Sequence, residues 1–154
     1  MAIMSSLPLT QTGTPWIDTR TQDLSDLAKR YLLSIPRLAS GTYTPTLTAV
    51  ANVAAKTAYA CQVLRVGISV TVSGQVDIDP TAGATLTQLG ISLPLASALT
   101  AASQCAGTAV APAVAGYAAA IRGDATNDRA ELAFTAGADA ANRAWYFSFT
   151  YQLI

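Results

Sequence analysis

Apolar and polar residues alternate strictly along three segments of the chain. The longest begins at residue 68 and places Ser, Thr, Gln and Asp between its apolar members, with an interruption at Gly74: Ile68, Val70, Val72, Val76 and Ile78. The second runs nearly to the C-terminus: Trp145, Phe147, Phe149, Tyr151 and Leu153. The third is shorter: Ala130, Leu132 and Phe134. A period of two residues indicates β-strands with one buried face.

Turn residues recur at short intervals around these segments and set the expected fold class. They are Asp79-Pro80, Gly83, Gly90, Gly107, Gly116, Gly123-Asp124 and Gly137. Residues 59–66 can pair with residues 68–78 across a tight hairpin turn at Val66-Gly67. The spacing predicts roughly seven or eight short strands, without the βαβ alternation of a parallel sheet. We therefore expect an all-β fold, an antiparallel β-sandwich of jelly-roll type.

The first 40 residues follow a different pattern. Residues 1–22 are rich in Pro, Gly, Ser and Thr and show no periodicity, which predicts an N-terminal extended arm. Residues 23–35 place apolar side chains on one face of a 3.6-residue repeat, which predicts one short helix that Pro36 ends. We expect two parts: an anchoring or assembly segment over 1–40 and a β-sandwich domain over 41–154.

The arm and the helix supply the candidate binding residues. A tryptophan in a polar arm needs a pocket, either on its own domain or on another protein. A helix this short is marginally stable alone, so its apolar stripe either packs on the chain's own β-domain or binds further copies or a partner. The candidate residues for binding the particle or a partner are Trp16, Leu24, Leu27, Tyr31, Leu32 and Ile35.

Composition and charge narrow the possible partners. Of the 154 residues, 51% are hydrophobic and only 12% are charged, with a net charge of zero. Basic residues are scattered, so neither nucleic acid nor an anionic membrane surface is an expected partner. The apolar run 109–121 is too short to span a bilayer and contains Pro112 and Gly116, and the N-terminus has no secretory signal pattern. We expect the protein to stay in a cytoplasm until it assembles.

Residues that could perform chemistry are few. The chain has no histidine, which removes the commonest general base and most zinc sites. Two acidic patterns, Asp77 with Asp79 and the loop with Asp124, Asn127 and Asp128, could hold calcium or do acid–base work. A polar strand face and ordinary turns explain them more simply. We therefore expect no catalytic residue, no metal and no cofactor.

The cysteines and the C-terminal aromatic residues also have structural explanations. Cys61 and Cys105 are expected to be buried thiols, and a bridge between them stays an alternative. Four of the five aromatic residues in 145–151 fall on the buried face of one strand, which favours a core over a sugar-binding platform. Tyr146 is the exception and points to the opposite face.

Three motifs together carry a resemblance to a known family. They are G-T-Y-T-P-T-L from Gly41, the R-V-G-x-x-V-T-V-S-G-x-V hairpin from Arg65, and the terminal W-x-F-x-F-T-Y-Q from Trp145. The stretches 40–80 and 128–154 resemble a module of bacteriophage virion proteins. The resemblance implies a β-sandwich on a tail fibre, head fibre or capsid decoration protein, commonly trimeric and without catalytic residues. Residues 1–40 lie outside it.

Together these points predict a non-enzymatic structural component of a tailed-phage particle. The chain lacks a long repetitive shaft, which favours a capsid decoration (cement) protein or a short head-fibre protein. Expected partners are further copies, as a homotrimer, and the major capsid protein or another virion protein. One alternative is a tail-fibre-type host-recognition module that binds a surface glycan or protein. A glycan-cleaving enzyme is the other, with Asp77/Asp79 and Asp124/Asp128 as its only candidate carboxylates.

Overall fold

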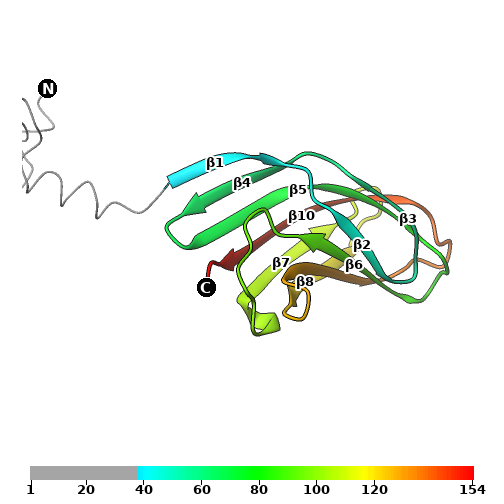
Figure 1. Cartoon of the computed structure of the whole chain (residues 1–154). Coiled ribbons are helices and arrows are strands. Elements are labelled where there is room, and N and C mark those ends of the chain that lie inside the picture. The colour runs from blue at the N-terminus through cyan, green and yellow to red at the C-terminus, as the bar shows by residue number, and fades with distance from the viewer. Residues whose placement is uncertain (1–37) are drawn as a thin grey trace, which may run out of the picture. The chain divides into compact units, whose positions relative to one another are not determined.

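The computed structural model describes residues 38–154, and these residues form a nearly all-β, antiparallel fold (Figure 1). A single 3₁₀ turn, η2 (Ala102–Gln104), is the only helical element among them. The strands are β1 (Leu38–Tyr43), β2 (Leu47–Ala51), β3 (Val53–Ala58), β4 (Cys61–Val66), β5 (Ser69–Pro80), β6 (Leu86–Ser92), β7 (Cys105–Val110), β8 (Ala118–Asp124), β9 (Arg129–Thr135) and β10 (Arg143–Gln152). The expected all-β class is confirmed. The expected arm and helix lie outside the described residues.

The strands belong to one ten-stranded sheet that curls. Its order is β1-β4-β5-β10-β7-β8-β9-β6-β2, and β3 pairs with β5 beside that path. The strands β2 and β3 follow one another through a single residue, Asn52. β2, the last strand of this order, is therefore joined through Asn52 to β3, which pairs with β5 near the start of the order. This connection requires the sheet to curl back on itself.

One long ribbon accounts for this bend. The strands β4 and β5 pair antiparallel from Val66↔Ser69 to Gln62↔Ser73. The turn of this hairpin is Gly67-Ile68, one residue later than the predicted Val66-Gly67. Gly67 has φ +63°, a conformation that glycine adopts without steric cost. Beyond this hairpin the same two chain segments stay paired, first as β3 with β5 and then as β2 with β6. Residues 47–66 and 69–92 thus form one ribbon that bends in its middle.

Asn52 holds the corner of the ribbon. Its backbone is left-handed, with φ +55°, and asparagine tolerates this conformation better than most residues. Its side-chain Nδ2 donates to the carbonyl of Ala82 at 2.9 Å and to Thr87 Oγ1 at 2.8 Å. Its Oδ1 accepts from the Ala82 N–H at 2.8 Å. Asn52 therefore ties both halves of the bent ribbon together where ladder pairing is interrupted.

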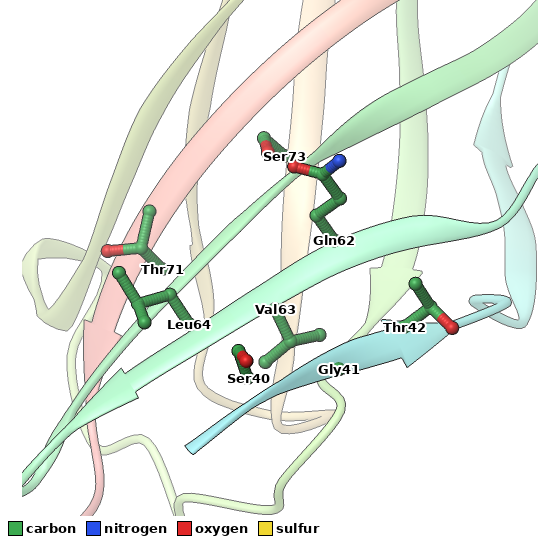
Figure 2. Close-up of a pocket in the computed structure, with 8 residues that line it drawn as sticks. All are labelled: Ser40, Gly41, Thr42, Gln62, Val63, Leu64, Thr71 and Ser73. Carbon is green, nitrogen blue, oxygen red and sulfur yellow. The ribbon is translucent and has the colours of Figure 1, made fainter. Parts of the chain in front are cut away.

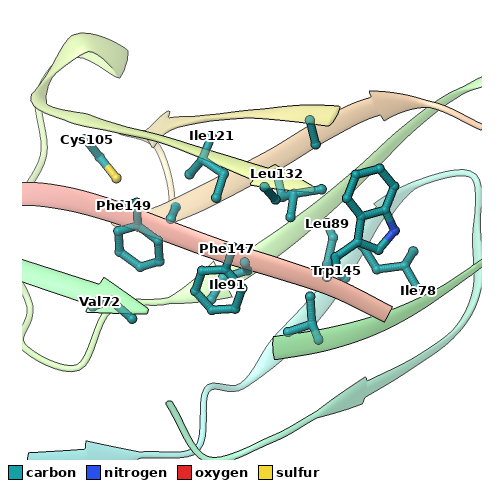
Figure 3. Packing of buried hydrophobic residues seen from close by; sticks show 14 of the residues in the cluster. Val72, Ile78, Leu89, Ile91, Cys105, Ile121, Leu132, Trp145, Phe147 and Phe149 are labelled. Carbon is teal, nitrogen blue, oxygen red and sulfur yellow. The ribbon is translucent and has the colours of Figure 1, made fainter. Parts of the chain in front are cut away.

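The alternation read from the sequence builds the core. In β5 the side chains of Val70, Val72, Val76 and Ile78 are buried, and in β10 those of Trp145, Phe147, Phe149 and Tyr151 are buried. Figure 3 shows the β10 aromatic rings lying among aliphatic side chains of β6, β8 and β9. The Phe134 and Trp145 rings lie 4.2 Å apart. The predicted buried faces of these strands are confirmed.

Three details differ from the expectation. The described residues contain ten strands, because Ala- and Gly-rich segments such as β7 and β8 pair although they show little alternation. Ile68 was expected in the buried face of β5 but is 58% exposed. It is the second residue of the two-residue turn Gly67-Ile68, outside the strand in which side chains alternate between faces. The first strand begins at Leu38, three residues before the boundary predicted at Gly41.

Candidate functional site

The binding residues predicted from sequence lie outside the described part of the chain. They are Trp16, Leu24, Leu27, Tyr31, Leu32 and Ile35. The attachment surface that they would form stays a prediction. The candidate surface described below comes from the folded strands instead.

The candidate surface is the side of β1, β4, β5, β10 and β7 that faces away from the core. Strand register aligns its residues in rows across the sheet. One row is Ser40, Leu64, Thr71, Thr150 and Ala106, and the next is Thr42, Gln62, Ser73, Ser148 and Thr108. Flanking rows add Leu38, Val66, Ser69, Gln152, Gln75, Tyr146 and Val110. None of the side chains in these rows is charged, and we call these rows the uncharged face. The outward side of β5 continues beyond Gln75 to Asp77, which borders the uncharged face.

Small hydroxyl-bearing side chains dominate the middle of the uncharged face. The hydroxyls of Thr71 and Thr150 lie 2.9 Å apart and hydrogen-bond across neighbouring strands. Beside them a shallow depression of about 500 Å³ extends over β1, β4 and β5 (Figure 2). Gln62, Leu64, Thr71 and Ser73 are among its lining residues. The surface therefore offers short, neutral hydrogen-bonding groups and no ion that would have to lose its water on contact.

Apolar side chains are exposed on the same face. Leu64 is 46% exposed, Val66 47%, Val110 48% and Tyr146 50%. Tyr146 lies opposite the buried aromatic residues of β10, as the sequence predicted. The predicted polar members of the β5 and β10 alternation, such as Thr71 and Ser148, were the sequence signal for this face. Their convergence was not predicted, because it depends on which strands become neighbours.

Two ion pairs lie over β8 and β9, beside the uncharged face. Arg122 pairs with Glu131 at 2.7 Å, and Gln88 donates to the same Glu131 Oε1 at 2.9 Å. Arg129 pairs with Asp124 at 2.8 Å. The strands β8 and β9 thus carry paired ions, whereas the rows of the uncharged face carry none.

Three of the acidic residues singled out in the sequence, Asp77, Asp124 and Asp128, have internal partners. Asp77 accepts from the Tyr59 hydroxyl at 2.8 Å and from Gln75 Nε2 at 3.0 Å. The hydrogen bond to Asp77 raises the pKa of Tyr59. Asp124 accepts from Arg129 and, at 2.7 Å, from Asn127 Nδ2. Burial alone would raise the pKa of Asp124, but these hydrogen bonds hold it below its usual value.

Asp128 has a structural role that the sequence did not indicate. Its carboxylate accepts the backbone N–H groups of Ser97 and Leu99, each at 2.9 Å. Burial alone would raise its pKa, but the backbone hydrogen bonds hold the pKa below the usual range. Asp128 therefore fastens the long connection between β6 and β7 to the loop between β8 and β9. Its position four residues after Asp124 was the sequence feature that suggested a calcium-binding loop.

Both cysteines are free and buried, as the thiol interpretation predicted. Cys61 lies opposite Gly74, between the β4 and β5 backbones. Burial raises the pKa of the Cys61 thiol and raises that of Cys105 to about 11. A thiol with a raised pKa is protonated near neutral pH and is a weak nucleophile.

Residues 38–154 contain no group of three His, Cys, Asp or Glu side chains placed to hold a metal ion. Over the same residues, no helix has the length and apolar composition needed to cross a membrane.

The chain was compared with models of protein families, with curated proteins and with solved structures. None of these comparisons found a match.

Proposed function

We propose that the chain is a non-enzymatic structural component of a tailed-phage particle, either a capsid decoration protein or a short head-fibre protein. It acts by self-assembly and by docking on the virion. The observation that carries this proposal is the uncharged face. Burying an ion costs free energy unless it is paired and hydrogen-bonded, so a broad neutral surface of small side chains suits permanent contact with other protein surfaces.

The size of the face fits such a contact. Five adjacent strands about 4.8 Å apart, with about seven residues rising roughly 3.3 Å each, project an area of about 500 Å². Side-chain relief makes the accessible area larger than this projection. One partner in a standard interface buries about 800 Å². The face can therefore supply most of one side of a specific interface, and many copies on a particle would add such contacts by multivalency.

The bent ribbon supports the finer architecture of this proposal. In a sandwich of jelly-roll type, a long antiparallel ribbon folds over so that its two halves lie in opposing sheets. The corner at Asn52, with β3 and β5 before it and β2 and β6 after it, fits that description. Copies of such a sandwich can pack their uncharged faces around a closed symmetry axis, and we propose three copies.

The carboxylates of Asp77, Asp124 and Asp128 form hydrogen bonds within the chain, which favours assembly over the two rival functions. A host-recognition module or a glycan-cleaving enzyme would need side chains free to meet a ligand. Asp124 and Asp128 instead bind Asn127, Arg129 and the 97–99 backbone. Asp77 binds Tyr59 and Gln75.

Charges placed on the face test the proposal. The double variant Thr108→Lys with Ser148→Lys adds two exposed cations to neighbouring strands without touching the core. We expect it to lower the copy number measured by light scattering and to lose binding to capsids in co-sedimentation. Asn142→Lys, at an exposed loop position, is the matched control. Unchanged assembly and unchanged capsid binding in the double variant would refute the proposal. A particle map by electron microscopy that placed the chain at a tail tip would favour host recognition.

A further inference from the structure

The strand β1 forms an open edge of the sheet. It pairs with β4 over all six of its residues and with no other strand among those described. In an antiparallel ladder every second residue directs its N–H and C=O groups to one side. On the side away from β4, about half of the backbone groups of β1 therefore face outward. Figure 2 shows β1 as the outermost strand beside β4.

This edge lacks the usual protection. Natural edge strands carry charged residues, proline or a bulge that prevents another strand from adding to them. The segment Leu38–Tyr43 contains none of these, and its register with β4 is regular throughout. Its first residue, Leu38, is 74% exposed. The strand at the other end of the order, β2, is protected by a register shift between Ala49 and Ala51. Of these two end strands, only β1 is thus unprotected.

We propose that β1 pairs antiparallel with β1 of a second copy of this chain, so that the two sheets become continuous. Two properties of the strand favour a second copy as occupant. It carries no charge, so two identical strands meet without repulsion. Its middle residues Ala39, Ser40 and Gly41 are small and allow close approach.

The pleat of the sheet limits the possible registers, and two of those that it allows pair five of the six β1 residues. Directly opposite residues in an antiparallel pair lie on the same face of the sheet. Outward residues of one copy must therefore meet outward residues of the other. The two-fold axis then passes either through Ser40, with Leu38 opposite Thr42, or through Gly41, with Ala39 opposite Tyr43. This pairing does not rest on the virion role. In the three-copy assembly proposed above, it would link one ring of copies to another.

Disulfide trapping in the full chain tests the pairing and its register. Two cysteines can be bridged when their Cα atoms lie about 4.4–6.8 Å apart, as residues opposite one another across a two-fold axis do. Gly41→Cys and Ser40→Cys are tolerable changes, because a Cβ at Gly41 meets nothing within 4 Å and Ser40 is exposed. The native cysteines are buried. Thr126→Cys, at an exposed loop position, is the matched control.

We expect one of the two edge variants to form a covalent dimer under mild oxidation, at least tenfold more than Thr126→Cys does. Cross-linking of both variants only at the control level would overturn the proposal. A charge pair gives a second readout: Gly41→Lys and Gly41→Asp should each lower the mass measured by light scattering, and their mixture should restore it. Recovery of the mass in the mixture is expected only if the lysine of one copy lies close to the aspartate of the other across the two-fold axis. If neither variant lowers the mass, the edge is not a contact between copies, whatever the Thr108 and Ser148 variants show.

Discussion

Gly74 illustrates how single residues control the packing between strands of this sheet. It lies on the core side of β5 between Cys61 of β4 and Phe147 of β10. A Cβ atom at this position would lie only 2.3 Å from the Cys61 Sγ and 2.8 Å from the Cys61 Cβ. The glycine that interrupts the apolar alternation in the sequence is therefore part of the buried face, where its missing side chain makes room for Cys61.

Gly74→Ala should destabilise the protein because neither Cys61 nor the β4 backbone can move away freely. Overpacking of this kind costs about 1–3 kcal/mol, measurable as a lower urea midpoint of unfolding. Gly41→Ala is the control, since its Cβ meets nothing within 4 Å, and it should change stability little. In a double-mutant cycle, Cys61→Gly should recover part of the loss. A strictly additive cycle would contradict the proposed clash.

Asp128 should make stability depend on acid pH. Its folded-state pKa lies below the usual value, so it contributes stability above the unfolded pKa of about 3.9, and that contribution is lost as pH falls through the folded pKa. Asp128→Asn keeps one acceptor for the Ser97 and Leu99 N–H groups and leaves one of them unpaired. We expect a loss of about 1–3 kcal/mol at pH 7.

The pH comparison separates the carboxylate from general damage to the loop. The difference in unfolding free energy between wild type and Asp128→Asn should shrink when urea titrations are repeated below about pH 4, because the unfolded wild-type chain then binds a proton at Asp128 more readily than the folded chain does. A difference of the same size at pH 7 and pH 3 would show that the charge of Asp128 does not matter.

At the scale of elements, the bent ribbon depends on Asn52. The residue supplies both a left-handed backbone and three side-chain hydrogen bonds at the corner. Asn52→Gly keeps the backbone conformation and loses the hydrogen bonds, whereas Asn52→Ala loses both. The Ala variant should therefore be the less stable of the two by about 1 kcal/mol. Thermal unfolding followed by circular dichroism measures this order, and equal melting temperatures would show that backbone strain at the corner is negligible.

At the scale of the whole molecule, the described strands carry two ion pairs over β8 and β9 and the uncharged face over β1, β4, β5, β10 and β7. The ion pairs suit contact with water, whereas the uncharged face suits contact with protein. The role of residues 1–40 in attachment stays a prediction from the sequence.

The N-terminal helix prediction can be tested in the full chain. Leu27→Asp combined with Leu32→Asp places two charges in the expected apolar stripe. If the stripe binds a partner, the variant should be released from capsids in co-sedimentation and keep its β-sheet circular dichroism. Truncation of a buried leucine typically costs about 2–5 kcal/mol. A melting temperature many degrees lower, with attachment retained by the folded fraction, would show that the helix instead belongs to the core of its own domain.

The sequence by itself determined the strands of clear alternation, their buried faces and the hairpin that turns at Gly67, because a period of two residues and a tight turn are local properties of the chain. It also identified Tyr146 as facing away from the core. The same local signals misplaced Ile68, since a turn residue does not follow the pleat. They also missed β7 and β8, whose Ala and Gly residues pair without alternating.

Only the tertiary structure decided how these strands are arranged. The Thr71 and Thr150 hydroxyls meet although they are 79 residues apart, and no local pattern specifies which distant strands become neighbours. The uncharged face, the corner at Asn52, the capping of the 97–99 backbone by Asp128 and the open edge at β1 all follow from that long-range pairing. Each residue's type was readable from the sequence, but its partners depend on register and on the curl of the sheet.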